Sequence, residues 1–425
     1  MSVLYLERLA DTVLDDKLSY MSAVLIRGVK WCGKTSTAAR QAKSILYMQD
    51  PDTANQNIEM AGIRPSNLLL GEKPRLLDEW QTAPVLWDSV RFAVDQDNAN
   101  GQFILTGSAT PSNDAVMHTG TGRIARMTMR TMSLFESLES TNEVSLANLF
   151  ESPESIGGYS NLTVNDYAYL IARGGWPKAV VDSTSNKSWG LQTAKECFLS
   201  IIESDISRVD DIKRNPRYAR SLLKSLARNT STQANLKTIR ADMESDGVTI
   251  SDKTVASYVN SLRRIFILDE ISAWSPKMRS KTALRSSPTW HLVDPSLAVA
   301  ALDADPDRLL GDLSTMGLLF ESLCVRDLRV YASMIDGDIL HFRDRTGLEV
   351  DAIVQLNNGR WGAVEIKLGS TKAVEEAAAN LFKLRNRIDT SAVSEPEFLM
   401  VLTGGQYAYR REDGIYVVPL GCLCP

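Results

Sequence analysis

The sequence is poor in the residues that build metal-rich or disulfide-rich proteins. Its 425 residues include three histidines and five cysteines, which are Cys32, Cys197, Cys324, Cys422 and Cys424. So few histidines leave little material for a histidine-rich metal site, and the short C-x-C at the end is a weak metal signal. Scattered cysteines favour a reducing compartment over a disulfide framework. We therefore expect a cytoplasmic protein.

Long apolar runs and an excess of positive charge are also missing. No run approaches the ~20 apolar residues that a membrane helix needs, so we expect no membrane partner. The formal net charge is −5, so the chain as a whole is not a polycation that binds nucleic acid, and such binding must come from a local patch. Hydrophobic residues make up 44% of the chain, and its length predicts two or three globular domains.

What the sequence does contain is a complete phosphate-binding loop (P-loop) of the form G-x-x-x-x-G-K-[ST] at residues 28–35. Its residues are Gly28, Val29, Lys30, Trp31, Cys32, Gly33, Lys34 and Thr35. The two glycines let the backbone approach a polyphosphate, and the N–H groups of the loop then point at phosphate oxygens. We expect Lys34 to contact the β- and γ-phosphates and the Thr35 hydroxyl to contact Mg²⁺.

The sequence on both sides of the loop agrees with this interpretation. Residues 22–27 are typical of a short buried strand that leads into the loop, and residues 36–46, beginning with Ser36, are typical of the helix that leaves it. We include Ser36 among the nucleotide-binding residues. The alternative is a chance match in a glycine turn, which the flanking strand and helix argue against.

A second nucleotide motif follows at residues 75–79, a short apolar strand that ends in two carboxylates. Downstream of a P-loop, Asp78 is expected to hold Mg²⁺ and Glu79 to orient or deprotonate the attacking water. The strand at residues 101–110 turns polar at Thr106 and Ser108, where it would face the ligand crevice of an open α/β sheet. Either residue is a candidate sensor of the γ-phosphate, and a simple polar turn is the alternative.

Arg123 and Arg126 follow that strand and are candidates for the cation that neutralises charge in the transition state. We assign Arg123 to this role, and we predict Arg123, Lys34 and Glu79 as the catalytic residues of the ATPase.

These motifs resemble one family in their order along the chain. They are similar to motifs of bacterial and archaeal AAA-type ATPases that carry a C-terminal domain of unknown function, family 4143. The matching segments are the P-loop and residues 77–80, 105–108, 122–136, 173–177, 203–207 and 291–297. The resemblance covers nearly the whole chain. It implies an ATPase in the N-terminal half and a nuclease-like C-terminal half, but no physiological role.

Residues 191–275 are mostly helical in pattern and carry basic side chains. Two helices joined by a turn, the second beginning at Ser251, and then a strand-like segment near Ile265 resemble a winged helix-turn-helix. Lys253, Arg263 and Arg264 are candidate contacts for DNA phosphates. The alternative is a helical bundle with solvated charges, which the nearby acidic residues favour.

The C-terminal part contains the second constellation of chemical interest. A helix carrying Glu321 precedes two strand-like segments, and Asp351 lies fourteen positions before Glu365, a natural distance for a hairpin. Alternation along the second strand places Glu365 and Lys367 on one face. The set resembles the restriction-endonuclease-like fold, in which an acidic residue is followed by Glu-x-Lys. The three carboxylates would then hold Mg²⁺, and Lys367 would orient the nucleophile or stabilise developing charge.

We therefore predict an α/β protein in three parts: an AAA-like P-loop ATPase domain at residues 1–150, a winged-helix-like helical region at 151–285, and a restriction-endonuclease-like domain at 286–425. The predicted cofactors are ATP and Mg²⁺, and the predicted activity is ATP hydrolysis coupled to a module that binds or cuts double-stranded DNA. The alternative is a nucleotide-dependent switch or scaffold with a catalytically silent nuclease fold. Homo-oligomerisation is left open.

Overall fold

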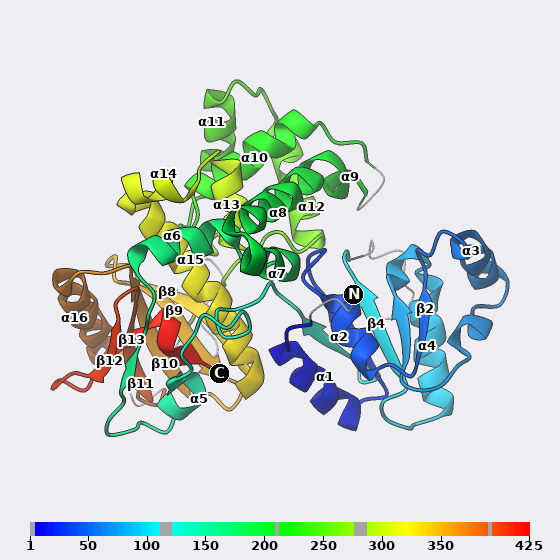
Figure 1. Cartoon of the computed structure of the whole chain (residues 1–425), viewed down its shortest axis with the longest axis horizontal. Coiled ribbons are helices and arrows are strands. Elements are labelled where there is room, and N and C mark those ends of the chain that lie inside the picture. The colour runs from blue at the N-terminus through cyan, green and yellow to red at the C-terminus, as the bar shows by residue number, and fades with distance from the viewer. Residues whose placement is uncertain (1–4, 111–120, 209–211, 276–286, 390–392) are drawn as a thin grey trace. The chain divides into compact units, whose positions relative to one another are not determined.

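A computed structural model describes the whole chain except residues 1–4, 111–120, 209–211, 276–286 and 390–392. The chain divides into two compact units (Figure 1). Unit 1 comprises residues 1–131, 203–214 and 259–267, and unit 2 comprises residues 132–202, 215–258 and 268–425. Two helical segments, η4 (Ile201–Asp205, a π-helical turn) and α12 (Asp252–Arg264), run from one unit into the other.

Unit 1 is built on a parallel five-stranded sheet. Its strands are β1 (Ala23–Arg27), β2 (Ser44–Tyr47), β3 (Arg75–Asp78), β4 (Phe103–Gly107) and β5 (Ile124–Thr128), in the order β2-β3-β4-β1-β5. Its helices are α1 (Leu9–Tyr20), α2 (Lys34–Gln41), α3 (Ala54–Ile63), α4 (Val85–Gln96) and α9 (Ile206–Arg208), with shorter turns η1 (Pro65–Leu69) and η2 (Trp80–Thr82). The central strands are apolar and buried because helices cover a parallel sheet on both faces.

The helix that follows the P-loop is shorter than predicted. The sequence predicts a helix over residues 36–46, but α2 ends at Gln41 and residues 44–47 form β2. This part of the prediction is wrong because Ser44 to Tyr47 pair in parallel with β3, and sheet pairing outweighs local helix propensity.

The helices of unit 2 form a large α-helical region beside a mixed sheet. They are α5 (Leu146–Leu149), α6 (Val164–Arg173), α7 (Pro177–Ser185), α8 (Lys187–Ser200), α10 (Pro216–Arg228), α11 (Leu236–Ser245), α13 (Pro295–Ala301), α14 (Pro306–Gly311), α15 (Leu313–Ala332) and α16 (Thr371–Arg387), with turns η6 (Ser333–Ile335) and η7 (Leu420–Cys422). Leu222, Leu223 and Leu226 give α10 a buried apolar side, which agrees with its sequence pattern.

The seven-stranded sheet of unit 2 has the order β7-β12-β13-β11-β10-β9-β8. Its strands are β7 (Gly158–Tyr159), β8 (Gly337–Arg343), β9 (Glu349–Leu356), β10 (Trp361–Lys367), β11 (Phe398–Thr403), β12 (Tyr407–Arg410) and β13 (Tyr416–Pro419), and a separate pair joins β6 (Val144–Ser145) to β14 (Leu423–Cys424). Strands β8, β9 and β10 are antiparallel neighbours. Strand β10 pairs in parallel with β11, and helix α16 connects these two strands. The predicted hairpin, Glu-x-Lys strand and following helix are thus confirmed as secondary structure.

Helix α16 packs its apolar face on this sheet. Leu381 and Leu384 are fully buried and share one core cluster with Ile353 of β9, Ala363 of β10 and Val401 of β11. This packing fixes the position of the helix relative to the strands that carry the predicted nuclease residues.

The boundary after the ATPase domain differs from the prediction. The sequence places it near residue 150, but residues 132–150 belong to unit 2. Two contacts within unit 2 account for the difference. The Leu134 N–H donates to Asp327 of α15 at 2.9 Å, and β6 pairs with β14 at the end of the chain. The predicted division of the remainder into a helical region and a C-terminal domain is not visible as separate compact units.

A buried ion cluster holds this part of unit 2 together. Arg326 donates to Asp294 at 3.2 Å and to Asp327 at 2.7 Å, and all three side chains are nearly inaccessible to solvent. Asp294 also accepts from the Gly175 N–H at 2.9 Å. The cluster therefore joins the start of α13, the chain before α7 and helix α15.

Replacing Arg326 with alanine should lower the free energy of unfolding by about 3–5 kcal/mol, because two buried carboxylates would lose their shared cation. Urea unfolding followed by circular dichroism measures this change. Arg385→Ala is the control, since its ion pair with Glu395 is exposed and is expected to contribute less than about 1 kcal/mol. Equal stabilities of the two variants would contradict the prediction.

Candidate ATP site and C-terminal carboxylate cluster

The predicted P-loop joins the carboxyl end of β1 to the first turn of α2. Gly28 has a φ of 155°, and a Cβ there would lie 2.1 Å from the Met129 carbonyl oxygen. Gly33 has a φ of 106° and directly precedes α2. Trp31, half-exposed at the tip, also has a positive φ of 61°. Both glycines of the motif therefore lie where the backbone conformation favours glycine.

Lys34 is the first residue of α2, and its side chain turns back into the loop. It is 4% exposed, and its Nζ donates to the Val29 carbonyl at 2.8 Å. This places the ammonium inside the loop, next to the backbone that is expected to surround a phosphate chain.

Three polar side chains from separate elements meet beside the loop. Thr35 Oγ1 and Thr106 Oγ1 each donate to Asp78 Oδ1 at 2.7 Å. The sheet order explains the meeting, because β4, which carries Thr106, lies between β1 and β3. The structure thus brings together the two residues predicted to hold Mg²⁺ and the predicted γ-phosphate sensor. Carboxylate and hydroxyl oxygens are suitable Mg²⁺ ligands.

Glu79 follows directly and has a left-handed backbone with a φ of 56°. Its N–H donates to Thr106 Oγ1 at 3.1 Å. Its Oε2 accepts from Ser108 Oγ at 2.7 Å and from the amide of Gln81. Glu79 is therefore oriented by neighbours on β4 and η2, and a strained backbone of this kind persists only where surrounding bonds hold it.

The structure does not bring Arg123 to this site. Arg123 precedes β5, and its neighbour Ile124 pairs with Ala23 at the start of β1, whereas the P-loop follows the end of β1. A five-residue strand spans about 16 Å. Arg123 therefore lies near the amino ends of the strands, opposite to the carboxyl ends where the P-loop lies, and it forms an ion pair with Asp95. Arg126 lies in the middle of β5 with its guanidinium 5.4 Å from the Trp87 ring centre. The sequence could not reveal this, because the direction of β5 depends on its pairing.

Sequence reasoning also missed residues that support the loop from a distance. Arg8, 5% exposed, donates to the carbonyl of Cys32 at 2.6 Å and to that of Arg130 at 2.9 Å. Lys30 forms an ion pair with Asp205, 175 positions further along the chain. No spacing in the sequence signals either contact, although residues 203–207 carry part of the family resemblance.

The four predicted nuclease residues lie close enough to influence one another. Lys367 Nζ donates to Glu365 Oε2 at 2.9 Å and to Asp351 Oδ2 at 3.3 Å. Asp351 Oδ2 also accepts from the Ile366 N–H at 2.7 Å, which fixes it against β10. Burial, and then the nearby charge of Asp351, raise the pKa of Glu321 well above its ordinary value. Asp351 and Glu365 thus both contact the Lys367 ammonium.

Glu365 is the most enclosed acid of this group. It is 3% exposed, and its Oε1 accepts from Asn380 Nδ2 of α16 at 2.5 Å. Burial and the neighbouring Asp351 raise the pKa of Glu365 to about 7. Asn380 also donates to the Glu349 carbonyl at 2.6 Å, so it links the helix to β9 and to the carboxylate. Asn380 gave no signal in the sequence.

The carboxylates converge on a lysine, and they are not spaced as a preformed metal site. Within the described ranges, no group of three or more histidine, cysteine or acidic side chains is arranged to hold a metal ion. The predicted metal ligands Glu321, Asp351 and Glu365 supply the carboxylate oxygens that Mg²⁺ prefers. Mg²⁺ binding by these residues stays a prediction.

The basic residues of the middle helices are largely engaged with neighbours. On α10, Arg217 donates to the Gly247 carbonyl at 3.2 Å, and Lys224 pairs with Asp246 at 2.9 Å. Arg264 Nε donates to the Thr110 carbonyl at 3.0 Å, whereas Lys253 is exposed. Ser251 caps α12 as predicted, through the Thr254 N–H at 3.2 Å. Binding of DNA by these helices, and their winged-helix character, stay predictions.

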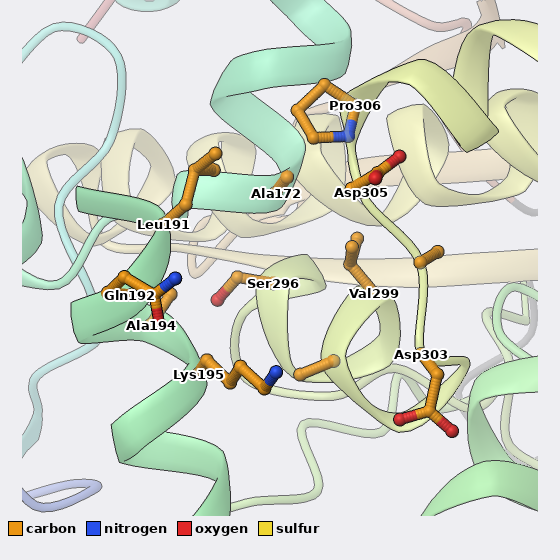
Figure 2. Close-up of a pocket in the computed structure, with 12 residues that line it drawn as sticks. Ala172, Leu191, Gln192, Ala194, Lys195, Ser296, Val299, Asp303, Asp305 and Pro306 are labelled. Atoms are coloured by element: carbon orange, nitrogen blue, oxygen red, sulfur yellow. The ribbon is translucent and has the colours of Figure 1, made fainter. Parts of the chain in front are cut away.

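Unit 2 also has a cavity of about 310 Å³ that the sequence did not predict (Figure 2). Leu191, Gln192 and Lys195 of α8 line one side, and Ser296 and Val299 of α13 line another. The cavity involves none of the predicted nucleotide or nuclease residues.

Unit 1 has the parallel sheet and the phosphate-binding loop of an α/β P-loop NTPase, and comparison in sequence agrees. Residues 21–138 match the family model of an AAA domain, residues 164–308 match a domain of unknown function (DUF8612), and residues 316–423 match a domain of unknown function (DUF4143). The chain thus matches an AAA domain model in its N-terminal part and the 4143 family model in its C-terminal part. No curated protein matches the chain.

Two solved structures show a distant likeness. The Walker-type ATPase of Pyrococcus abyssi is 14% identical with a TM-score of 0.44, over 70% of this chain and 96% of that one. A structure of Drosophila ORC bound to DNA is 11% identical with a TM-score of 0.21, over 65% of this chain and 88% of that one. Both scores are too low to support an argument about this fold. Every helix that the structure describes is too short or too polar to span a bilayer.

Proposed function

We propose that the protein hydrolyses ATP with Mg²⁺ in unit 1 and that its C-terminal domain acts on duplex DNA. The observation that carries the proposal is the meeting of Thr35, Asp78 and Thr106 at the mouth of the P-loop, with Glu79 held next to them. Bound Mg²⁺ would supply charge neutralisation on the phosphates. Thr35 and Asp78 would hold it, and Thr106 would orient Asp78.

The remaining residues of the loop would bind the phosphate chain. Lys34 would leave the Val29 carbonyl for phosphate oxygens, which are stronger, charged acceptors. The backbone N–H groups from Val29 to Ser36 would complete the contacts. Glu79, oriented by Ser108 and Gln81, would accept a proton from the attacking water. Arg123 would reach a nucleotide only in a neighbouring copy of the chain, so its role depends on homo-oligomerisation.

In the C-terminal domain, Glu321, Asp351 and Glu365 would hold Mg²⁺, which lowers the pKa of bound water near a phosphodiester. Lys367, now bonded to two of these carboxylates, would orient the nucleophile or stabilise developing charge. The order of β8, β9, β10, α16 and β11 places Asp351 on β9 and Glu365 and Lys367 on the adjacent β10, which supports the restriction-endonuclease-like assignment.

The second candidate is a nucleotide-dependent switch with a silent nuclease fold. It is favoured by the double engagement of Lys367 and by the lack of a preformed metal site among the described residues. The two candidates share ATP binding and differ in chemistry at both sites.

One measurement separates them: the rate of phosphate release by the full-length protein with Mg²⁺, with and without duplex DNA. We expect saturable ATP hydrolysis, and we expect added DNA to change its rate at least about twofold. A twofold change requires a coupling free energy of only a fraction of a kcal/mol. ATP binding without turnover would favour the switch. An ATP hydrolysis rate that is the same with and without duplex DNA would contradict the proposed coupling.

A further inference from the structure

The ion pair between Lys30 and Asp205 ties the P-loop to a segment far away in the sequence. Lys30 Nζ lies 2.5 Å from Asp205 Oδ1, and the Asp205 side chain is 6% exposed. Both residues belong to unit 1. We infer that Asp205 is a positioning residue of the ATP site, which fixes Lys30 and, through it, the backbone of the phosphate-binding loop. The inference rests on the proposed ATP binding.

The local structure around Asp205 is unusual. Asp205 is the last residue of η4, the π-helical turn between α8 and α9. π-Helical turns are rare and occur often at functional sites. Behind it, Arg214 donates to the Ile206 carbonyl at 2.9 Å, and the Arg214 N–H donates to Ser207 Oγ at 3.1 Å. These bonds hold residues 206 and 207, which directly follow Asp205.

A buried carboxylate needs a cation, and the strained loop needs a restraint. Removing a charge from water costs several kcal/mol unless a partner compensates, and Lys30 is that partner here. The next residue, Trp31, has a positive φ of 61°. Such a backbone persists only when surrounding contacts hold it. Lys30 is held on one side of Trp31 by Asp205, and the Cys32 carbonyl is held on the other side by Arg8.

The position of the pair predicts which step it affects. Lys30 lies in the loop that would bind phosphates, whereas the hydrolytic residue Glu79 is oriented by a separate set of bonds. Loss of Asp205 should therefore weaken ATP binding and leave the turnover number unchanged. If Lys30 instead served chiefly as a free cation for the phosphates, removing its carboxylate would strengthen binding.

The test compares the Kd for Mg²⁺–ATP, the KM and the kcat of full-length wild-type protein with those of Asp205→Asn, Lys30→Met and the double variant. Each single change should raise Kd and KM about fivefold with kcat within about twofold, which corresponds to ~1 kcal/mol for a partly exposed ion pair. The double variant should bind no more weakly than either single variant, because the residues act as one pair. Asp205→Glu, which keeps the carboxylate, should bind more tightly than Asp205→Asn.

Asp182→Asn is the matched control, because it breaks an exposed ion pair with Lys178 in unit 2 and should leave Kd unchanged. Unchanged or tighter ATP binding by Asp205→Asn would overturn the inference while leaving the proposed function intact. Additive losses in the double variant would also overturn it. Wild-type protein that binds no ATP would overturn the proposed function as well. Should Asp205→Asn fail to fold, the double variant still decides, since it removes both charges and leaves neither unpaired. It should bind Mg²⁺–ATP as weakly as Lys30→Met, and tighter binding than Lys30→Met would overturn the inference.

Discussion

Replacing Glu79 with glutamine should lower the ATP turnover number at least about 100-fold, because a positioned general base contributes ~10²–10⁴-fold to such reactions. The amide keeps the size of the side chain and can still accept from Ser108, so the loop and its ATP affinity should be preserved. Phosphate release at saturating ATP measures turnover, and calorimetric titration of ATP checks that binding is intact.

Glu59→Gln is the control for this variant, since Glu59 is an exposed acid on α3 of the same unit. Its turnover should equal that of the wild type. A Glu79→Gln protein that hydrolyses ATP at the wild-type rate would show that Glu79 neither accepts the proton nor orients the water.

Asp351→Asn should abolish Mg²⁺-dependent cleavage of plasmid DNA, with a loss of at least about 100-fold relative to wild type. Loss of one charged ligand removes charge-assisted binding of the metal, and with it the activation of water. The asparagine oxygen can still accept from the Ile366 N–H, so the strand pairing should survive. Conversion of supercoiled to nicked and linear plasmid measures the rate.

Asp338→Asn is the matched control, because Asp338 is an exposed carboxylate on β8 of the same sheet. It should cut at the wild-type rate. If wild-type protein leaves plasmid intact in Mg²⁺ and in Mn²⁺ while it still binds ATP, the silent nuclease fold and the switch function would replace the proposed cleavage.

The sequence predicted those features that depend on short, contiguous motifs. The P-loop, the strand that ends at Asp78 and the Glu365-x-Lys367 strand each carry their chemistry within a few residues. Their spacing also fixed the β9–β10 hairpin, because fourteen positions allow two strands and a tight turn. The predicted place of Thr106, at the polar carboxyl end of a central strand, agrees with its bond to Asp78, although that bond itself was not predicted.

Features that depend on distant pairing could not be predicted in this way. Arg123 was assigned to the ATP site because it follows β4 in sequence, but the direction of β5 carries it to the opposite edge. Residues 44–47 continue a helical pattern, but they form an edge strand because they pair with β3. Asp205 lies 175 positions from Lys30, and although residues 203–207 carry part of the family resemblance, nothing in the sequence indicates that Lys30 is the partner.

The central claim is that the glycine-lined loop at residues 28–35 binds the triphosphate of ATP through Lys34 and Mg²⁺. Calorimetric titration of Mg²⁺–ATP into wild-type protein and into Lys34→Ala tests it most directly. The account predicts saturable binding by wild type and affinity at least about tenfold weaker for Lys34→Ala, since a charge-assisted bond contributes ~1.5–3 kcal/mol. Folded wild-type protein that takes up no Mg²⁺–ATP, or a Lys34→Ala variant with wild-type affinity, would contradict it.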